Sequence, residues 1–282
     1  MPASHVAQRL SFAFLCSGPL LAILLVAIRL LRIPVVHEVI GLAVFAMFAI
    51  AIGILGFQGF TSQQLEFRLA AIAATLLILP FALISLFWVG LGPPWLASPA
   101  ENQIRYLVLI TNAAAVVGGC IALKEALSIV GEGLYSTLGF TGMILAGPLY
   151  LVGEAILLAS FSALVRTGKV PEVFYSLSEF QDILLFFGGV LTYSAAAAYS
   201  ISLYKAGWLG RRASRAFVVL SVLALLCLVT RGLQFPAPDE SSMTWYTIPG
   251  FIAGIPAVPF IIPYFLGVVS LRRSSRPAPE SR

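Results

Sequence analysis

Apolar runs long enough to cross a lipid bilayer follow one another along this chain, and one of them carries a carboxylate in its interior. The run from Phe140 to Ser162 has 23 residues, enough at a rise of about 1.5 Å per residue to span a hydrocarbon core of roughly 30 Å. Glu154 lies near its middle, where an ionised group costs at least a few kcal/mol (about 2.5 to 3.5). We therefore expect Glu154 to face other helices or a wet cavity, or to stay protonated, and not to face lipid.

The composition excludes an ordinary soluble protein. Of the 282 residues, 60% are hydrophobic and 10% are charged, whereas a soluble domain has about 25% charged residues. The net charge of +5 does not indicate nucleic-acid binding, because the basic residues lie between apolar runs and at the C-terminus rather than on a soluble face. We expect the lipid bilayer as the main partner, and no nucleic acid.

Eight apolar segments each have close to the 20 or so residues that a spanning helix needs. They lie near residues 10–30, 38–60, 68–90, 104–126, 139–163, 181–204, 214–232 and 248–271. The sequence thus predicts an all-α polytopic integral membrane bundle of about eight transmembrane helices, forming a single domain over residues 1–273. The polar tail over 274–282 is rich in Pro, Ser and Arg, and we expect it to be disordered and cytoplasmic.

The basic residues predict the orientation of the bundle. With the N-terminus inside, eleven of the 17 Lys and Arg residues fall on the inner side and the remaining six on the outer side. The positive-inside rule then places both termini in the cytoplasm. Short loops and the missing targeting signal favour a bacterial cytoplasmic membrane.

The sequence predicts no cofactor, no metal site and no catalytic residue. Cys16, Cys120 and Cys227 lie in apolar segments without a short-spaced partner, which argues against disulfides and a thiolate zinc site. Only His5 and His37 could supply imidazoles, so a haem held by paired histidines within the bundle is not expected. The chain also lacks the motifs of zinc proteases, serine hydrolases and nucleotide-binding loops.

Glu154 is the principal candidate functional residue. Tyr150 precedes it by four residues and shares its helical face. In the predicted orientation Asn112 in the fourth span, and Tyr193 or its neighbour Thr192 in the sixth, lie at a similar depth. We hypothesise a small polar cavity around Glu154 that opens outward. The alternative is a solitary buried hydrogen-bonding group that fixes the register of the helices.

Two charged residues could extend this cavity. Arg231 approaches from the outer end of the seventh span and is the first candidate partner for Glu154. Asp182 lies near the outer end of the sixth span, where a carboxylate can reach water. Asp182 is therefore a weaker candidate than Glu154.

The last predicted span contains four prolines. Pro249, Pro256, Pro259 and Pro263 interrupt it, and each proline inside a helix removes a donor and disturbs the carbonyl four residues earlier. The sequence predicts a proline-kinked last helix. It either lines a solute route as a broken helix, with Pro256 and Pro259 at the route, or is simply a kinked packing helix.

Small residues predict close helix contacts. Ala114, Gly118 and Ala122 in the fourth span form overlapping small-xxx-small pairs, so we expect this helix at the centre of the bundle. Gly188 and Gly189 indicate a similar contact for the sixth span.

Three classes of function stay open. The first is binding or translocation of a small or lipid-like solute through the cavity around Glu154. The second is a non-catalytic scaffold, sensor or accessory subunit that acts through helix–helix contacts, for example at Gly118 and Gly189. An intramembrane enzyme is third. Polar groups that converge on a continuous cavity would favour the first class.

Overall fold

The structure is a computed structural model that describes residues 5–29, 34–92, 94, 97–232, 252–254 and 258–275. Within these ranges the regular structure is helical and no strand occurs. Seven of the described helices are long and apolar enough to cross a membrane. The predicted all-helical class is confirmed, and each predicted segment from the first to the seventh corresponds to one of these helices.

The helices follow one another with short connections. Their bounds are α1 (His5–Arg29), α2 (Pro34–Phe60), α3 (Leu65–Leu86) with the π-helical turn η1 (Phe87–Leu91), α4 (Pro99–Ile129), α5 (Leu134–Thr167), α6 (Val173–Lys205), α7 (Arg211–Gly232) and α9 (Ile261–Ser274). Most extend several residues beyond the predicted segments, because hydropathy detects only the apolar middle of a helix.

Local sequence sets these ends. Ser98 and Glu101 form a capping box at the start of α4: the Ser98 hydroxyl accepts from the Glu101 N–H at 3.3 Å, and the Ser98 N–H donates to the Glu101 carboxylate at 2.6 Å. At the end of α5, Gly168 adopts a left-handed φ of 72° and donates to the Leu164 carbonyl at 2.9 Å.

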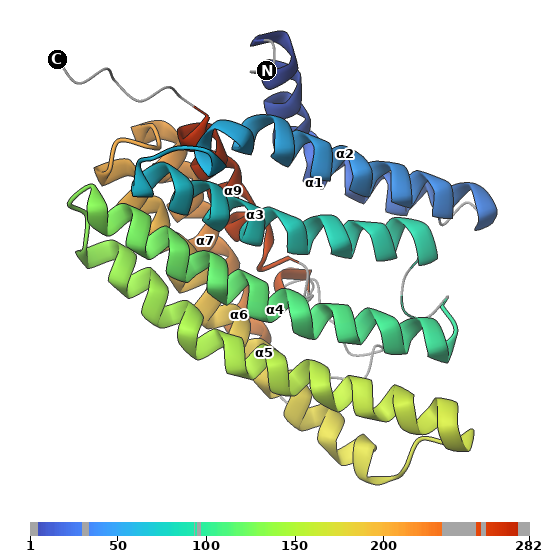
Figure 1. The fold of residues 1–282 in the computed structure, drawn as a ribbon. Helices are drawn as coiled ribbons and strands as arrows, with labels where there is room; N and C mark the ends of the chain where they lie inside the picture. Colours follow the sequence, from blue (N-terminus) through green and yellow to red (C-terminus); the bar gives the residue numbers. More distant parts are fainter. Residues whose placement is uncertain are drawn as a thin grey trace, which may run out of the picture.

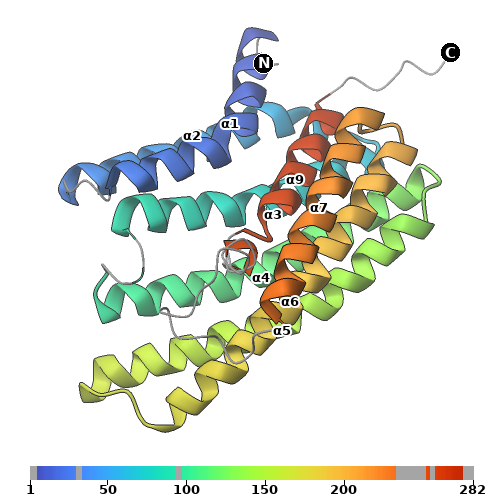
Figure 2. The same ribbon diagram turned by 180° about the vertical axis from the view of Figure 1, so that it is seen from behind.

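Helices α2 to α5 form a row in chain order, and α6, α7 and α9 lie across that row (Figures 1 and 2). Each helix from α2 to α7 packs against its neighbour in sequence, and α9 returns to pack on α3. The most buried of the seven long helices is α3, not the predicted α4. The reason is a group of small residues that lets neighbours approach α3 from several sides: Ala70, Ala71, Ala73 and Ala74 are all fully buried.

Glycines set the closest contacts among α3, α4, α5 and α6. A Cβ atom on Gly119 would lie 2.9 Å from the Leu77 side chain, whereas one on Gly118 would meet only an ordinary contact at 3.6 Å. The tight face of α4 therefore lies one residue away from the predicted one. A Cβ on Gly139 would lie 2.6 Å from the Tyr199 ring. The predicted contact of Gly189 is present, with Leu228 of α7 at 2.9 Å from such a Cβ.

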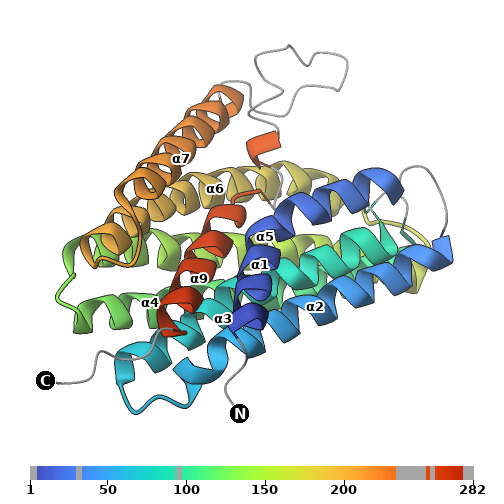
Figure 3. The same cartoon turned by 90° about the horizontal axis from the view of Figure 1, so that it is seen from above.

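Arginines near the end of α9 join three helices at one end of the bundle. Arg273 forms an ion pair with Glu66 of α3 at 3.0 Å, and Arg272 lies over the Phe12 ring of α1 at 4.7 Å. The first residue of α1 and the last of α9 accordingly lie at the same end (Figure 3). This end also carries the connections α2–α3, α4–α5 and α6–α7, as alternate crossings of a membrane require.

Helix α9 begins in the middle of the bundle and runs to this end (Figure 1). Its 14 residues reach about 21 Å, less than the thickness of a bilayer. Pro259 precedes its N-cap residue, Phe260, and Pro263 lies in its first turn, where a proline needs no hydrogen-bond donor. Pro249, Pro256 and the tail over 276–282 lie outside the described residues.

Candidate functional site

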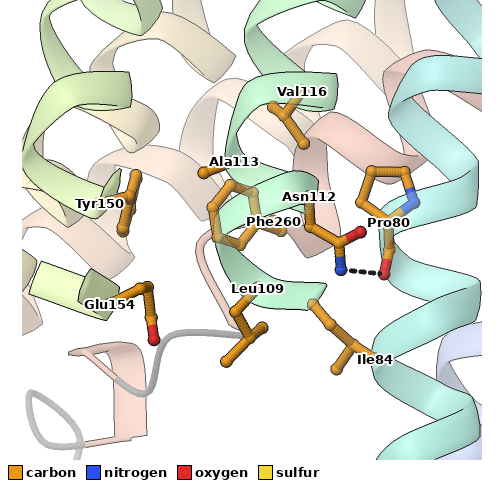
Figure 4. Close-up of a pocket in the computed structure, with 9 residues that line it drawn as sticks. All are labelled: Pro80, Ile84, Leu109, Asn112, Ala113, Val116, Tyr150, Glu154 and Phe260. Carbon is orange, nitrogen blue, oxygen red and sulfur yellow. Dashed lines mark hydrogen bonds between the residues drawn. The ribbon is translucent and has the colours of Figure 1, made fainter. Parts of the chain in front are cut away.

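Glu154 lies on the inward face of α5 with 3% of its surface exposed. It lines a pocket between α3, α4 and α5 that Phe260 closes from the side of α9 (Figure 4). Its Oε2 atom has no hydrogen-bond partner, and no described residue forms an ion pair with it within 4.0 Å. Glu154 is thus a buried carboxyl group whose Oε2 atom is unused by the protein.

The pocket is small and mostly apolar. Its lining consists of Pro80, Ile84, Leu109, Asn112, Ala113, Val116, Tyr150, Glu154 and Phe260. The volume open to the centre of a water molecule is about 10 Å³, which is close to the minimum for one water. In this conformation the pocket accommodates about one water molecule and not a solute.

Tyr150 lines the pocket with its ring and turns its hydroxyl toward α6. The hydroxyl lies 3.1 Å from the Thr192 hydroxyl, which donates to the Gly188 carbonyl at 2.8 Å. Because the Thr192 proton is committed to Gly188, Tyr150 is the donor to Thr192. The Tyr150 ring packs at 5.0 Å from the ring of Phe260.

Asn112 lies on the opposite side of the pocket from Glu154 (Figure 4). Its amide nitrogen donates to the carbonyl of Pro80 on α3 at 3.1 Å. Leu109 and Phe260 lie between the two polar side chains in this view. Glu154, Tyr150 and Asn112 therefore line one pocket from opposite sides and do not converge on one point.

Tyr193 does not line the pocket. Its hydroxyl donates to the carbonyl of Ala253 at 2.9 Å and so joins α6 to the segment that precedes α9. Thr192, its neighbour, is the residue of α6 that reaches Tyr150. The two side chains point in different directions because consecutive positions on a helix do not share a face.

Arg231 pairs with Asp182 and not with Glu154. Its Nη2 atom lies 3.9 Å from the Asp182 Oδ2 atom, and its guanidinium packs directly against Gly254, where a Cβ atom would lie 2.5 Å from Nη1. The expectation that Arg231 partners Glu154 is corrected. The physical reason is that α7 packs on α6, so Arg231 meets the carboxylate of α6 before it can reach α5.

The prolines of the last span stand beside the site, not in its lining. Pro259 lies close to Gly189, about 3.9 Å from where a Cβ would be, and its neighbour Phe260 lines the pocket. Pro256 is outside the described residues, so its predicted place at the route stays a prediction.

A second, apolar cavity adjoins this pocket. It has a volume of about 220 Å³ and is lined by Ala22, Ile23, Val26, Phe81, Ile84, Ser85, Trp88, Val258 and Ile261. Ile84 lines both spaces. Ile23, on the α1 side, is 57% exposed, so this cavity lies at the surface that lipid covers.

Arg105 is fully buried one turn above Leu109 on α4. Its guanidinium donates to the Gly92 carbonyl at 2.5 Å and lies 5.7 Å from the centre of the Trp88 ring. It lines neither cavity. Its charge is held on the side of the α3–α4 connection.

Glu132, in the connection between α4 and α5, is the contrasting buried carboxylate. It accepts hydrogen bonds from the N–H groups of Tyr135 and Ser136, both at 3.0 Å, and from the Ser202 hydroxyl. Burial raises the pKa of Glu132, but these hydrogen bonds outweigh it and hold the pKa below its ordinary value of 4.5. Both carboxylate oxygens of Glu132 therefore accept hydrogen bonds within the protein.

Sequence reasoning missed the apolar walls of the site. Ile84, Leu109 and Phe260 carry no chemical signal that separates them from other core residues. Pro80 had one, because a proline within a span disturbs the helical hydrogen bonds and attracts polar side chains such as Asn112. Within the described ranges no group of three or more His, Cys, Asp or Glu residues could hold a metal ion.

No protein-family model, curated protein or solved structure matches this chain. The seven apolar helices define a multi-pass integral membrane protein. Its function has to be argued from the site itself.

Proposed function

We propose that the protein binds a small or lipid-like solute within the membrane and translocates it past Glu154. The observation that carries the proposal is the carboxyl group of Glu154, a residue that lines an interior pocket. It is 3% exposed, and its Oε2 atom has no hydrogen-bond partner. A buried polar group without a partner costs about 1–3 kcal/mol. A group that lowers stability and leaves an oxygen unused by the fold is best explained by a ligand that uses it.

The proposed arrangement in the membrane has eight crossings, with α9 as the inner half of a proline-broken last one. Both termini lie in the cytoplasm, and the membrane is the bacterial cytoplasmic membrane. Support comes from the α1 start and α9 end at one end of the bundle and from the arginines at that end, Arg272, Arg273, Arg211 and Arg212.

Two features support access for a solute larger than water. The 220 Å³ cavity and the pocket share Ile84 as a lining residue, and movement of this side chain is the route that we propose between them. Three residues after Ile84, at Phe87, the backbone changes from α3 to the π-helical turn η1, and Gly92 donates to the Phe87 carbonyl at 3.1 Å. Such turns inside helices often occur at functional sites.

The experiment is a thermal-shift screen of the detergent-solubilised protein against small amphiphilic compounds. A ligand at 100 times its Kd stabilises the folded state by about 2.7 kcal/mol. We expect Glu154→Gln and Glu154→Leu to abolish the shift of every true ligand. Glu125→Gln, which changes an exposed carboxylate paired with Lys124, should leave the shifts intact. Ligands that stabilise Glu154→Leu as much as the wild type would contradict the proposal.

The second candidate is a scaffold or accessory subunit that acts through helix contacts. The pocket volume of about 10 Å³ and the close α6–α7 contact at Gly189 favour it. In that case Gly189→Ala would disturb the assembly, whereas Glu154→Gln would change nothing.

A further inference from the structure

We infer that the solute is a lipophilic organic cation, an ammonium group carried on an apolar chain. It reaches the apolar cavity from the bilayer and places its positive group at Glu154 after Ile84 moves aside. This inference rests on the proposed function and deepens it by naming the class of solute and its route.

The charged residues near the two cavities indicate the charge of the solute. Among the described residues, Glu154 is the one charged side chain that lines either cavity. Arg105 is turned toward Gly92 and Trp88, and Arg231 toward Asp182. A cation in the pocket would therefore meet a carboxylate whose Oε2 atom is unpaired, whereas an anion would be repelled by it.

The hydrogen-bonding groups of the pocket also favour a positively charged solute. The Tyr150 proton is committed to Thr192, and the Asn112 amide donates to the Pro80 carbonyl. Among the described residues that line the pocket, Glu154 Oε2 is the side-chain polar atom that is buried without a partner, and in its ionised form the carboxylate is only an acceptor. The complement of this pocket is a donor.

Aromatic rings beside Glu154 suit a positive group as well. Tyr150 and Phe260 both line the pocket, with ring centres 5.0 Å apart. The face of an aromatic ring attracts ammonium ions, and most strongly where water is excluded. Two of the nine lining residues are thus aromatic rings, in the same small pocket as the carboxyl group.

The neighbouring cavity fits the apolar chain. At about 220 Å³ it exceeds the roughly 150 Å³ at which an apolar protein cavity takes up benzene. Its one hydroxyl, that of Ser85, is satisfied by the Phe81 carbonyl at 2.8 Å. Ile23 exposes this cavity to the bilayer, where lipophilic cations concentrate.

Trp88 lines the apolar cavity and supplies the readout. The other three tryptophans, Trp95, Trp208 and Trp245, are replaced by Phe, and the protein is placed in lipid nanodiscs. Fluorescence of Trp88 is then titrated with ω-bromodecylammonium, whose bromine quenches on contact. The uncharged ω-bromodecanol and the anionic ω-bromodecanoate serve as matched probes.

We expect saturable quenching by the ammonium probe, weakened about tenfold or more in Glu154→Gln, which corresponds to about 1.4 kcal/mol. The alcohol and the carboxylate should quench only through partition into lipid, equally in both proteins. Ile84→Phe should weaken binding of the ammonium by blocking the route. Ile84→Ala should retain it, and Glu125→Gln should have no effect. Circular dichroism and thermal unfolding check that each variant is folded.

The outcomes separate the two proposals. Saturable, Glu154-dependent quenching by the alcohol or the carboxylate but not by the ammonium would overturn the cation and leave the proposed function standing. The same ammonium binding in Ile84→Phe as in the wild type would overturn the route. Quenching that depends on Glu154 for none of the three probes would overturn the inference. The proposed function itself fails only if the broader screen also gives no ligand that requires Glu154.

Discussion

Replacement of Glu154 by leucine should stabilise the protein while it abolishes ligand binding. The carboxyl group is 3% exposed and its Oε2 atom has no partner, so its removal relieves a desolvation cost of about 1–3 kcal/mol. Leucine is similar in size and would meet the apolar side chains of Leu109, Ala113 and Phe260. We expect the free energy of unfolding to rise by about 1–3 kcal/mol.

Glutamine separates the charge from the polarity of this side chain. Glu154→Gln keeps a polar group that finds no partner in the pocket, so its free energy of unfolding should stay within about 0.5 kcal/mol of the wild type. The control is Glu132→Leu, because Glu132 is also buried, with 7% of its surface exposed, but accepts three hydrogen bonds. It should lower the free energy of unfolding by at least about 2 kcal/mol.

The measurement is unfolding by SDS titration in mixed micelles, followed by circular dichroism. The reasoning is refuted if Glu154→Leu lowers the free energy of unfolding by 1 kcal/mol or more (about the worth of one hydrogen bond) while Glu154→Gln is neutral. That pattern would make Glu154 a structural hydrogen-bonding group.

Three further perturbations test other parts of the structure. Glu132→Gln should cost about 1–2 kcal/mol at pH 7. Hydrogen bonds lower the folded pKa of Glu132 from its ordinary value, so its contribution is complete above the unfolded pKa and is lost as the pH falls through the folded pKa. The difference in stability between variant and wild type should therefore shrink as the pH falls below the folded pKa. Gly139→Ala forces a Cβ to 2.6 Å from the Tyr199 ring and should lower the free energy of unfolding by about 1–3 kcal/mol. Gly53 has open space around it, so Gly53→Ala should raise the free energy of unfolding by up to about 1 kcal/mol. Equal changes in the unfolding temperature of the two variants would contradict this packing. Asp182→Asn should cost less than about 1 kcal/mol in the same unfolding assay, because the ion pair is long and its carboxylate is 38% exposed; a larger loss would show a stronger pair.

The spans were predictable because hydrophobic length is a strong and local signal. Seven predicted segments correspond to seven described helices, with differences mainly at the ends. The start of α4 shows why. Ser98 and Glu101 are polar and lie outside the predicted apolar segment, although they form the capping box at the N-terminus of the helix. Capping depends on single residues, whereas hydropathy averages over many.

The rotation of each helix was less predictable. On α4 the small-residue pattern pointed to Gly118, but the tight contact is at Gly119. Two adjacent glycines differ by about 100° around the helix axis, and small residues on both sides of α4 give no basis for a choice. The central place of α3 followed from its run of buried alanines, which composition alone did not separate from other apolar runs.

The sequence predicted the depth of the site residues along their helices, but not the partners toward which their side chains turn. Glu154, Tyr150 and Asn112 do line one pocket, because their positions along the spans place them at one level. Tyr193 was expected at the same depth and Arg231 at the outer end of the seventh span, yet they turn to Ala253 and Asp182. Depth follows from counting residues, whereas the choice of partner depends on which helices are neighbours.

The orientation of Glu154 in a bilayer is the most direct test of the account. Solid-state NMR of the protein in lipid, with ¹³C-labelled Glu and Leu, can measure which protons lie near the Glu154 carboxyl carbon. The signal is assigned by its absence in Glu154→Gln. The account predicts correlations with the methyl groups of Leu109 and none with lipid acyl chains. A carboxyl signal that correlates with acyl chains and not with Leu109 would contradict it.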